Sequence, residues 1–167
     1  MKEYFPDIAH IVYKGTEDEQ LLAYHYYNPE KLVHGKTMEE WLKLSVCYWH
    51  SFCWPGLDMF GGPTFDHPWF KNTKTEKAMY AKTDAAFELI EKLGVKYFCF
   101  HDIDIAFEEK TLEETLGLVK KSAEYIQKKM EKTGISLLWG TANLFTHKRY
   151  MSGAFTNPDP TIFAMAA

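Results

Sequence analysis

The stretch Gly94-Val95-Lys96-Tyr97-Phe98-Cys99-Phe100-His101-Asp102-Ile103-Asp104 decides the fold that we expect for this chain. Its β-branched and aromatic residues from Val95 to Phe100 are typical of a short buried strand. A histidine and two carboxylates follow, where the strand should give way to a loop. Functional groups in parallel α/β folds gather at the carboxyl ends of strands. His101 and Asp104 are therefore the first candidates for an active site.

Helices are predicted on both sides of this strand. Residues 75–93 place their apolar side chains on one helical stripe, and Gly94 follows in the position that ends many helices. Residues 111–133 begin with a Thr-x-x-Glu capping box and end at Gly134 in the same way. The pattern predicts a helix, a glycine and a strand, twice in succession.

Two further strands complete the predicted run. The first covers residues 44–49 and follows a short helix that starts at a second capping box, Thr37 to Glu40. The other covers residues 135–139, and Gly140 is expected to begin a loop. A β-α-β-α-β order requires right-handed crossovers and a parallel sheet.

The order of elements leaves two α/β folds open, a doubly wound sheet and a (β/α)8 barrel. No G-x-G-x-x-G pattern follows a strand, which counts against a dinucleotide-binding sheet. A barrel usually needs about 250 residues, so the 167 residues have room for three or four βα units. Residues 1–36 are irregular and are expected to form an arm. Residues 161–167 look like the first two turns of an apolar helix, and the sequence stops there without a C-terminal cap or a charged last turn, so we expect a truncated sequence.

Composition narrows the possible partners and the compartment. The net charge is −4 and there is no basic stripe, so nucleic acid is not an expected partner. No apolar run is long enough to span a membrane, and the first residues lack the long apolar stretch that is typical of a signal peptide. The cysteines Cys47, Cys53 and Cys99 lack CxxC spacing and are expected as free thiols, which fits a reducing cytoplasm.

The predicted strands end in Trp49, His101 and Trp139. If the strands are parallel, these three side chains lie on one face of the sheet. The imidazole of His101, which can act as a base near neutral pH, would then lie between the indole rings of Trp49 and Trp139. Asp104 can accept the Nδ1–H of His101 and fix its tautomer, whereas Asp102 is expected to point away or to cap the turn. Taken singly, such residues are more often a structural histidine and core tryptophans, and it is their convergence on one face that favours a functional site.

Aromatic faces around a small polar pocket suit a carbohydrate, because its C–H faces stack on rings while its hydroxyl groups form hydrogen bonds. The residues that would form such a pocket are Trp49, Phe60, Trp139, Thr141 and Phe145. A metal site built on His101, Asp102 and Asp104 is the alternative use of the central motif. Divalent metals need three or four well-placed ligands, and no second cluster of His and carboxylates occurs. We therefore expect no metal site within this chain alone.

Several motifs follow one another at natural spacing, and they carry a resemblance that runs from about residue 3 to the last residue. They are Tyr48-Trp49-His50, Phe60-Gly61-Gly62, Phe100-His101-Asp102-Ile103-Asp104, Trp139-Gly140-Thr141-Ala142-Asn143-Leu144-Phe145 and His147-Lys148-Arg149-Tyr150-Met151. Together they resemble D-xylose isomerase, in the long form with an extended N-terminal arm. The resemblance implies the N-terminal portion of a (β/α)8 TIM barrel, with the arm over residues 1–36 and the first βα units over residues 37–167.

The resemblance also implies an activity. The family interconverts an aldose and a ketose, D-xylose and D-xylulose, by a 1,2-hydride shift that two divalent metals (Mg²⁺, Mn²⁺ or Co²⁺) assist. It implies a cytoplasmic homotetramer, with D-glucose as a second candidate substrate. On the family pattern, His101 would serve ring opening, Asp104 would orient and polarise it, and Trp49 and Phe145 would wall the pocket.

Three further roles come from the same resemblance. Phe60 would reach into a neighbouring subunit's site, Thr141 would approach the substrate, and Trp139 would limit the size of the sugar. The family's metal-binding residues and its catalytic lysine come from later strands and have no counterpart here. We therefore expect the isolated chain to be inactive. A non-catalytic sugar-binding module, an unstable remnant of the barrel and a metal-dependent hydrolase on a related barrel are the alternatives.

Overall fold

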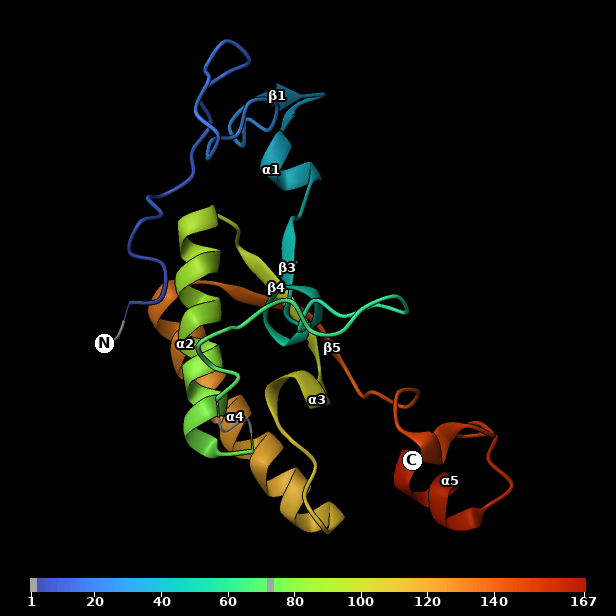
Figure 1. Cartoon of the computed structure of the whole chain (residues 1–167). Coiled ribbons are helices and arrows are strands. Elements are labelled where there is room, and N and C mark those ends of the chain that lie inside the picture. The colour runs from blue at the N-terminus through green and yellow to red at the C-terminus, as the bar shows by residue number, and fades with distance from the viewer. Residues whose placement is uncertain (1–2, 72–73) are drawn as a thin grey trace.

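Three parallel strands form the main sheet of this mixed α/β fold, in the order β3-β4-β5. They are β3 (Ser45–Cys47), β4 (Tyr97–His101) and β5 (Ser136–Thr141). The structure is a computed structural model that describes residues 3–71 and 74–167 (Figure 1). The parallel pairing that the element order predicted is confirmed.

Two long helices make the crossovers between these strands. They are α2 (Glu76–Leu93) and α4 (Leu112–Thr133), and they lie side by side against the sheet (Figure 1). Both predicted ends are confirmed, because Gly94 (φ 65°) and Gly134 (φ 75°) stop the helices in the left-handed conformation. The capping box predicted for α4 also forms, between Thr111 and Glu114.

The core lies between the sheet and these helices. Fully buried aromatic rings from the sheet side meet small and branched residues of α2, and α4 contributes Ile126. The largest fully buried side chains of the core are Tyr48, Phe52, Phe87, Ile90 and Phe98. This packing fixes the sheet face that carries Phe98, and it leaves the opposite face of β4 to Cys99 and His101.

The first strand is shorter than predicted. β3 ends at Cys47, Tyr48 has helical dihedral angles (φ −59°, ψ −43°), and a π-helical turn, η1 (Trp49–Cys53), follows. The prediction that residues 44–49 form a strand up to Trp49 is therefore wrong at its end. The turn lets the rings of Tyr48 and Phe52 enter the core together, with centroids 5.3 Å apart, and this packing outweighs the strand propensity of the aromatic residues.

The last strand is longer than predicted. Gly140 lies inside β5 and pairs with Phe100, so the expectation that it begins a loop is wrong. A Cβ atom at Gly140 would lie 3.3 Å from the Phe100 ring. Glycine therefore marks a close approach of strand and ring rather than the end of the strand.

The N-terminal segment reaches away from the sheet (Figure 1). It carries a two-stranded antiparallel hairpin of β1 (Leu32–Val33) and β2 (Lys36–Thr37), followed by α1 (Met38–Trp41). The capping box predicted at the start of α1 is confirmed. Tyr24 Oη donates to the carbonyl of Leu93 at 2.8 Å and ties this segment to the end of α2.

Three short helices complete the chain. α3 (Asp102–Ile105) follows β4 directly, and η2 (Lys148–Tyr150) and α5 (Pro160–Ala166) lie beyond β5. Figure 1 shows α5 and the segment before it set apart from the sheet. Within residues 3–71 and 74–167, no helix combines the length and apolar character that crossing a membrane would require.

Candidate functional site

His101 and Asp104 form a buried pair at the carboxyl end of β4. His101 is the last residue of the strand, and α3 begins immediately after it instead of the expected loop. The Oδ2 atom of Asp104 accepts the backbone N–H of His101 at 2.7 Å and lies 3.1 Å from its Nδ1 atom. The two residues are only 7% and 3% exposed. The Asp104 carboxylate therefore orients the His101 imidazole through its Nδ1 atom.

Three aromatic rings surround this histidine. The centroid of the His101 ring lies 5.2 Å from Trp49, 5.6 Å from Trp139 and 5.6 Å from Phe145. The rings of Trp49 and Phe145 are also 6.1 Å apart. The structure thus brings together five of the seven residues that the sequence singled out, namely His101 with Asp104, Trp49, Trp139 and Phe145, although Trp49 lies in η1, Trp139 inside β5 and Phe145 after β5.

The three aromatic rings around His101 are partly exposed to solvent. Trp49, Trp139 and Phe145 are 37%, 43% and 56% exposed, whereas His101 beneath them is buried. Such half-exposed rings leave their free faces available to a ligand. The site combines a buried acid–base group with aromatic surface.

Strand register explains where Trp139 and Thr141 lie. Cys99 pairs with Trp139 and His101 pairs with Thr141, after a register irregularity between Phe98 and Cys99. Thr141 therefore lies beside His101 on the neighbouring strand, and its predicted approach to the substrate stays a prediction.

Phe60 is not brought to this group. It lies in the long segment after η1, it is 90% exposed, and its backbone N–H donates to the Asp58 side chain at 2.7 Å. Within the described residues its ring makes no aromatic contact with the other site residues. Its predicted role in a neighbouring subunit's pocket stays a prediction.

Asp102 has a function in the structure that sequence reasoning missed. Its Oδ1 atom accepts the backbone N–H of Ile103, which agrees with the predicted capping of the turn, and it also accepts the backbone N–H of Asn143 at 2.8 Å. Asn143 is 6% exposed and belongs to the segment that carries Phe145. In the sequence, Asn143 can be recognised only as a short polar residue after the last predicted strand. That position does not show that Asp102 is its hydrogen-bond partner.

Cys53 and Lys82 lie behind the buried pair. The Cys53 Sγ atom donates to the carbonyl oxygen of Asp104 at 3.5 Å, and Lys82 Nζ donates to this sulfur at 3.5 Å. Burial raises the pKa of the Cys53 thiol to about 11, although the nearby ammonium group opposes this shift. The thiol therefore stays protonated at neutral pH. Cys47 and Cys99 are free as well.

The described part of the chain offers no metal centre. It contains no group of three or more His, Cys, Asp or Glu side chains that could hold an ion. The nitrogen and oxygen atoms of His101 and Asp104 that face each other satisfy one another. What these residues can do chemically is to hold and move a proton next to a bound molecule.

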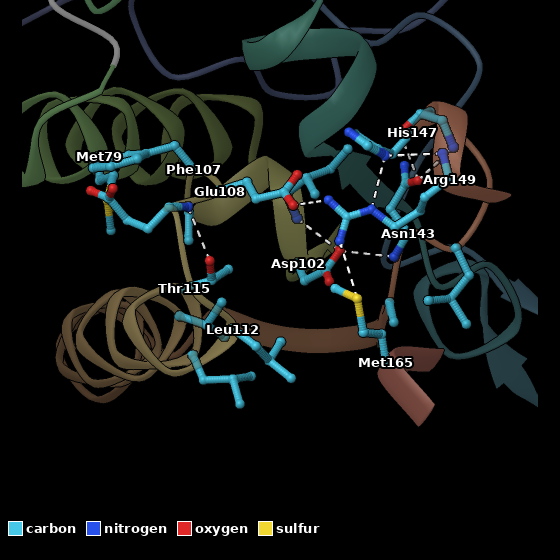
Figure 2. Close-up of a pocket in the computed structure, with 18 of the residues that line it drawn as sticks. Met79, Asp102, Phe107, Glu108, Leu112, Thr115, Asn143, His147, Arg149 and Met165 are labelled. Carbon is cyan, nitrogen blue, oxygen red and sulfur yellow. Dashed lines mark hydrogen bonds and ion pairs between the residues drawn. The ribbon is translucent and has the colours of Figure 1, made fainter. Parts of the chain in front are cut away.

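A cavity of about 870 Å³ has Asp102, Asn143 and Arg149 among its lining residues (Figure 2). Arg149 crosses it and contacts Glu108, the Nδ1 atom of His147 and the sulfur of Met165. This guanidinium thus connects the segment before α4 with η2 and α5. Because its donors are engaged within the chain, the cavity wall is held by internal contacts.

Comparison with known proteins identifies close relatives. No family model matches the chain. The xylose isomerase of Photobacterium profundum is 47% identical over 167 residues, which is 100% of this chain and 38% of that protein. The xylose isomerases of Mesorhizobium japonicum and Roseobacter denitrificans are 50% and 48% identical, over 98% and 100% of this chain. The chain is a homologue of the xylose isomerases, and it spans 38% of the length of these relatives.

Proposed function

We propose that this chain supplies the acid–base pair and the aromatic sugar wall of a D-xylose isomerase, which converts D-xylose to D-xylulose. The observation that carries the proposal is the His101–Asp104 pair enclosed by Trp49, Trp139 and Phe145. The homology with xylose isomerases over the whole chain supports it.

The geometry suits ring opening of a pyranose. When His101 Nδ1–H donates to Asp104, the tautomer is fixed and Nε2 is the basic atom. Nε2 can take the proton of the anomeric hydroxyl group and return a proton to the ring oxygen as the ring C–O bond breaks. The net proton count does not change, and the product is the open-chain aldose.

The aromatic residues would hold the sugar during this step. Trp49 and Phe145 would stack on its C–H faces, and Trp139 would set the available length of the pocket. Thr141, beside His101 in the register, would approach the substrate. A hexose such as D-glucose is a second candidate substrate, and Trp139 would disfavour it.

The two divalent metals of the family (Mg²⁺, Mn²⁺ or Co²⁺) do not fit the residues described here, which form no ligand cluster. We propose that the ligands of these metals lie outside this chain. The 167 residues alone are then expected not to convert D-xylose.

The proposal includes a TIM barrel, a homotetramer and a cytoplasmic location. In the sheet, β3 and β5 are the two outer strands, and all six residues of β5 are exposed. Further strands could add at these edges to close a barrel. The arm of residues 1–36 and the exposed Phe60 would serve contacts between subunits.

A chimera tests the function directly. This chain would replace the matched segment of the Photobacterium profundum enzyme, to which it is 47% identical. We expect the chimera to produce D-xylulose from D-xylose with Mg²⁺, Mn²⁺ or Co²⁺. The unchanged enzyme is the positive control. A folded chimera that converts no sugar would refute the proposal, and metal-independent saturable binding of D-xylose by the chain alone would favour a sugar-binding module instead.

A further inference from the structure

We propose that Asp102 is a positioning residue for the sugar pocket, because it fixes the segment that holds Phe145 against His101. The proposal rests on the proposed function for its effect on the sugar, but the contact itself belongs to the chain. The link joins the end of β4 to the segment after β5, across 41 positions of sequence.

The first half of the link is a carboxylate with two backbone donors. The Oδ1 atom of Asp102 accepts the N–H groups of Ile103 and Asn143, each at 2.8 Å. Figure 2 shows Asp102 and Asn143 facing each other at the wall of the neighbouring cavity. Since Asp102 follows His101 directly, any shift of Asn143 relative to Asp102 is also a shift relative to the imidazole.

The second half is a closed turn at Asn143. Its side-chain Oδ1 atom accepts the backbone N–H of Phe145 at 3.3 Å and that of Thr146 at 3.0 Å. The Thr146 hydroxyl group donates to the same atom at 2.8 Å. Asn143 is 6% exposed, so its side chain organises this turn from inside.

Packing alone holds the Phe145 ring weakly. The ring is 56% exposed, and its aromatic neighbours among the described residues are His101 and Trp49, at centroid distances of 5.6 and 6.1 Å. Its place in the pocket therefore depends on the backbone that carries it. Asp102 thus contacts Asn143, Asn143 contacts Phe145, and the Phe145 ring contacts His101, the residue directly before Asp102. These contacts form a closed series around the pocket.

Two substitutions can show whether Asp102 acts as a hydrogen-bond acceptor or through its negative charge. Asp102 acts here as an acceptor for two amide N–H groups, and an amide oxygen can accept them as well. Asp102→Asn should therefore keep the arrangement, whereas Asp102→Ala removes the acceptor. A residue that served catalysis by its negative charge would fail in both variants.

The contact is tested first in the 167-residue chain by NMR. We expect nuclear Overhauser effects between the ring protons of His101 and Phe145 in the parent and in Asp102→Asn, and their loss in Asp102→Ala and Asn143→Ala. Asp159→Ala is the matched control, because Asp159 also accepts a backbone N–H at 2.8 Å, from Thr161, at the start of α5. Persistence of the effects in both Asp102→Ala and Asn143→Ala would overturn the proposal.

The effect on the sugar is tested in the chimera. Asp102→Ala should raise KM for D-xylose about tenfold, equivalent to about 1.4 kcal/mol, while kcat changes by no more than about twofold. Asp102→Asn should restore KM. A KM unchanged in Asp102→Ala, or a large loss of kcat in Asp102→Asn, would overturn the positioning role. An inactive parent chimera would refute the proposed function instead, and the NMR result would still decide the contact.

Discussion

One carboxylate oxygen of Asp104 serves His101 twice, through the backbone N–H at 2.7 Å and the ring Nδ1 atom at 3.1 Å. The same oxygen therefore caps α3 and orients the imidazole. If the His101 ring turned, the Asp104 carboxylate would lose its contact with Nδ1. This carboxylate is only 3% exposed, so water could not easily replace the lost partner. The geometry of the short helix and the tautomer of the histidine are set together.

Replacement of His101 by Asn should remove the proton transfer and leave the fold. In the chimera we expect the rate with ring-closed D-xylose to fall by about 10²-fold or more, the usual contribution of a general acid–base group. Metal affinity should change little, since the proposed ligands lie elsewhere. Steady-state kinetics and metal titration measure the two quantities. Equal losses of both would identify His101 as a structural or metal-binding residue.

Trp139→Phe should widen the pocket, because a smaller ring replaces an indole that lies 5.6 Å from His101. The ratio of kcat/KM for D-glucose to that for D-xylose should rise, by about tenfold if the space of one carbon group is gained. Trp54→Phe is the control, since Trp54 lies in the exposed segment after η1 and bonds to Leu57. An unchanged ratio in Trp139→Phe would argue against its role in selecting the sugar.

Acid should release the first residues from α2. Glu88 accepts the backbone N–H groups of Tyr4 and Phe5, both at 2.8 Å. Burial raises the pKa of Glu88, but these bonds and Lys92 outweigh it and leave the pKa below the usual 4.5. This contribution to stability is therefore fully present above pH 4.5 and is lost as the pH falls through the lower, folded-state value.

The measurement for this release is the fluorescence of Trp69, whose ring centroid lies 6.0 Å from that of Tyr4. We expect a change with acid that precedes global unfolding. In Glu88→Ala, which removes both acceptor oxygens, the acid-dependent step should disappear and the segment should be released already at neutral pH. A Trp69 signal that follows the same acid titration in both proteins would contradict the assignment.

Cys53 should react slowly with alkylating reagents. In a Cys47→Ser, Cys99→Ser double variant, only this thiol remains, and burial raises its pKa to about 11. The rate of reaction with iodoacetamide should still rise with pH well beyond ~8.5, where an ordinary thiol is half ionised. Reduced glutathione is the reference. A rate that levels off near pH ~8.5 would show that the sulfur is not buried as described.

Local signals in the sequence predicted the helices accurately. The caps at Thr37 and Thr111 and the left-handed glycines Gly94 and Gly134 act within a few residues, so they can be recognised without tertiary information. The pairing of His101 with Asp104 belongs to the same class, because three positions separate the partners.

Long-range contacts decided what the sequence did not reveal. Tyr48 leaves the strand because the core accepts its ring, and Gly140 stays in the strand because the Phe100 ring lies against it. The bond between Asp102 and Asn143 depends on the register of β4 and β5. None of these partners is adjacent in sequence, so propensity alone gives the wrong result or none.

The acid–base pair is formed by residues close together in the sequence, whereas the aromatic residues around it come from distant parts of the chain. His101 and Asp104 meet within one turn, whereas Trp49 and Trp139 arrive from about fifty and forty positions away. The residues proposed for proton transfer and those proposed for sugar selection can therefore be substituted independently. On the proposed function, a designer who seeks a new substrate would vary Trp49 and Trp139 and leave residues 101–104 and Asn143, which holds the Phe145 segment, unchanged.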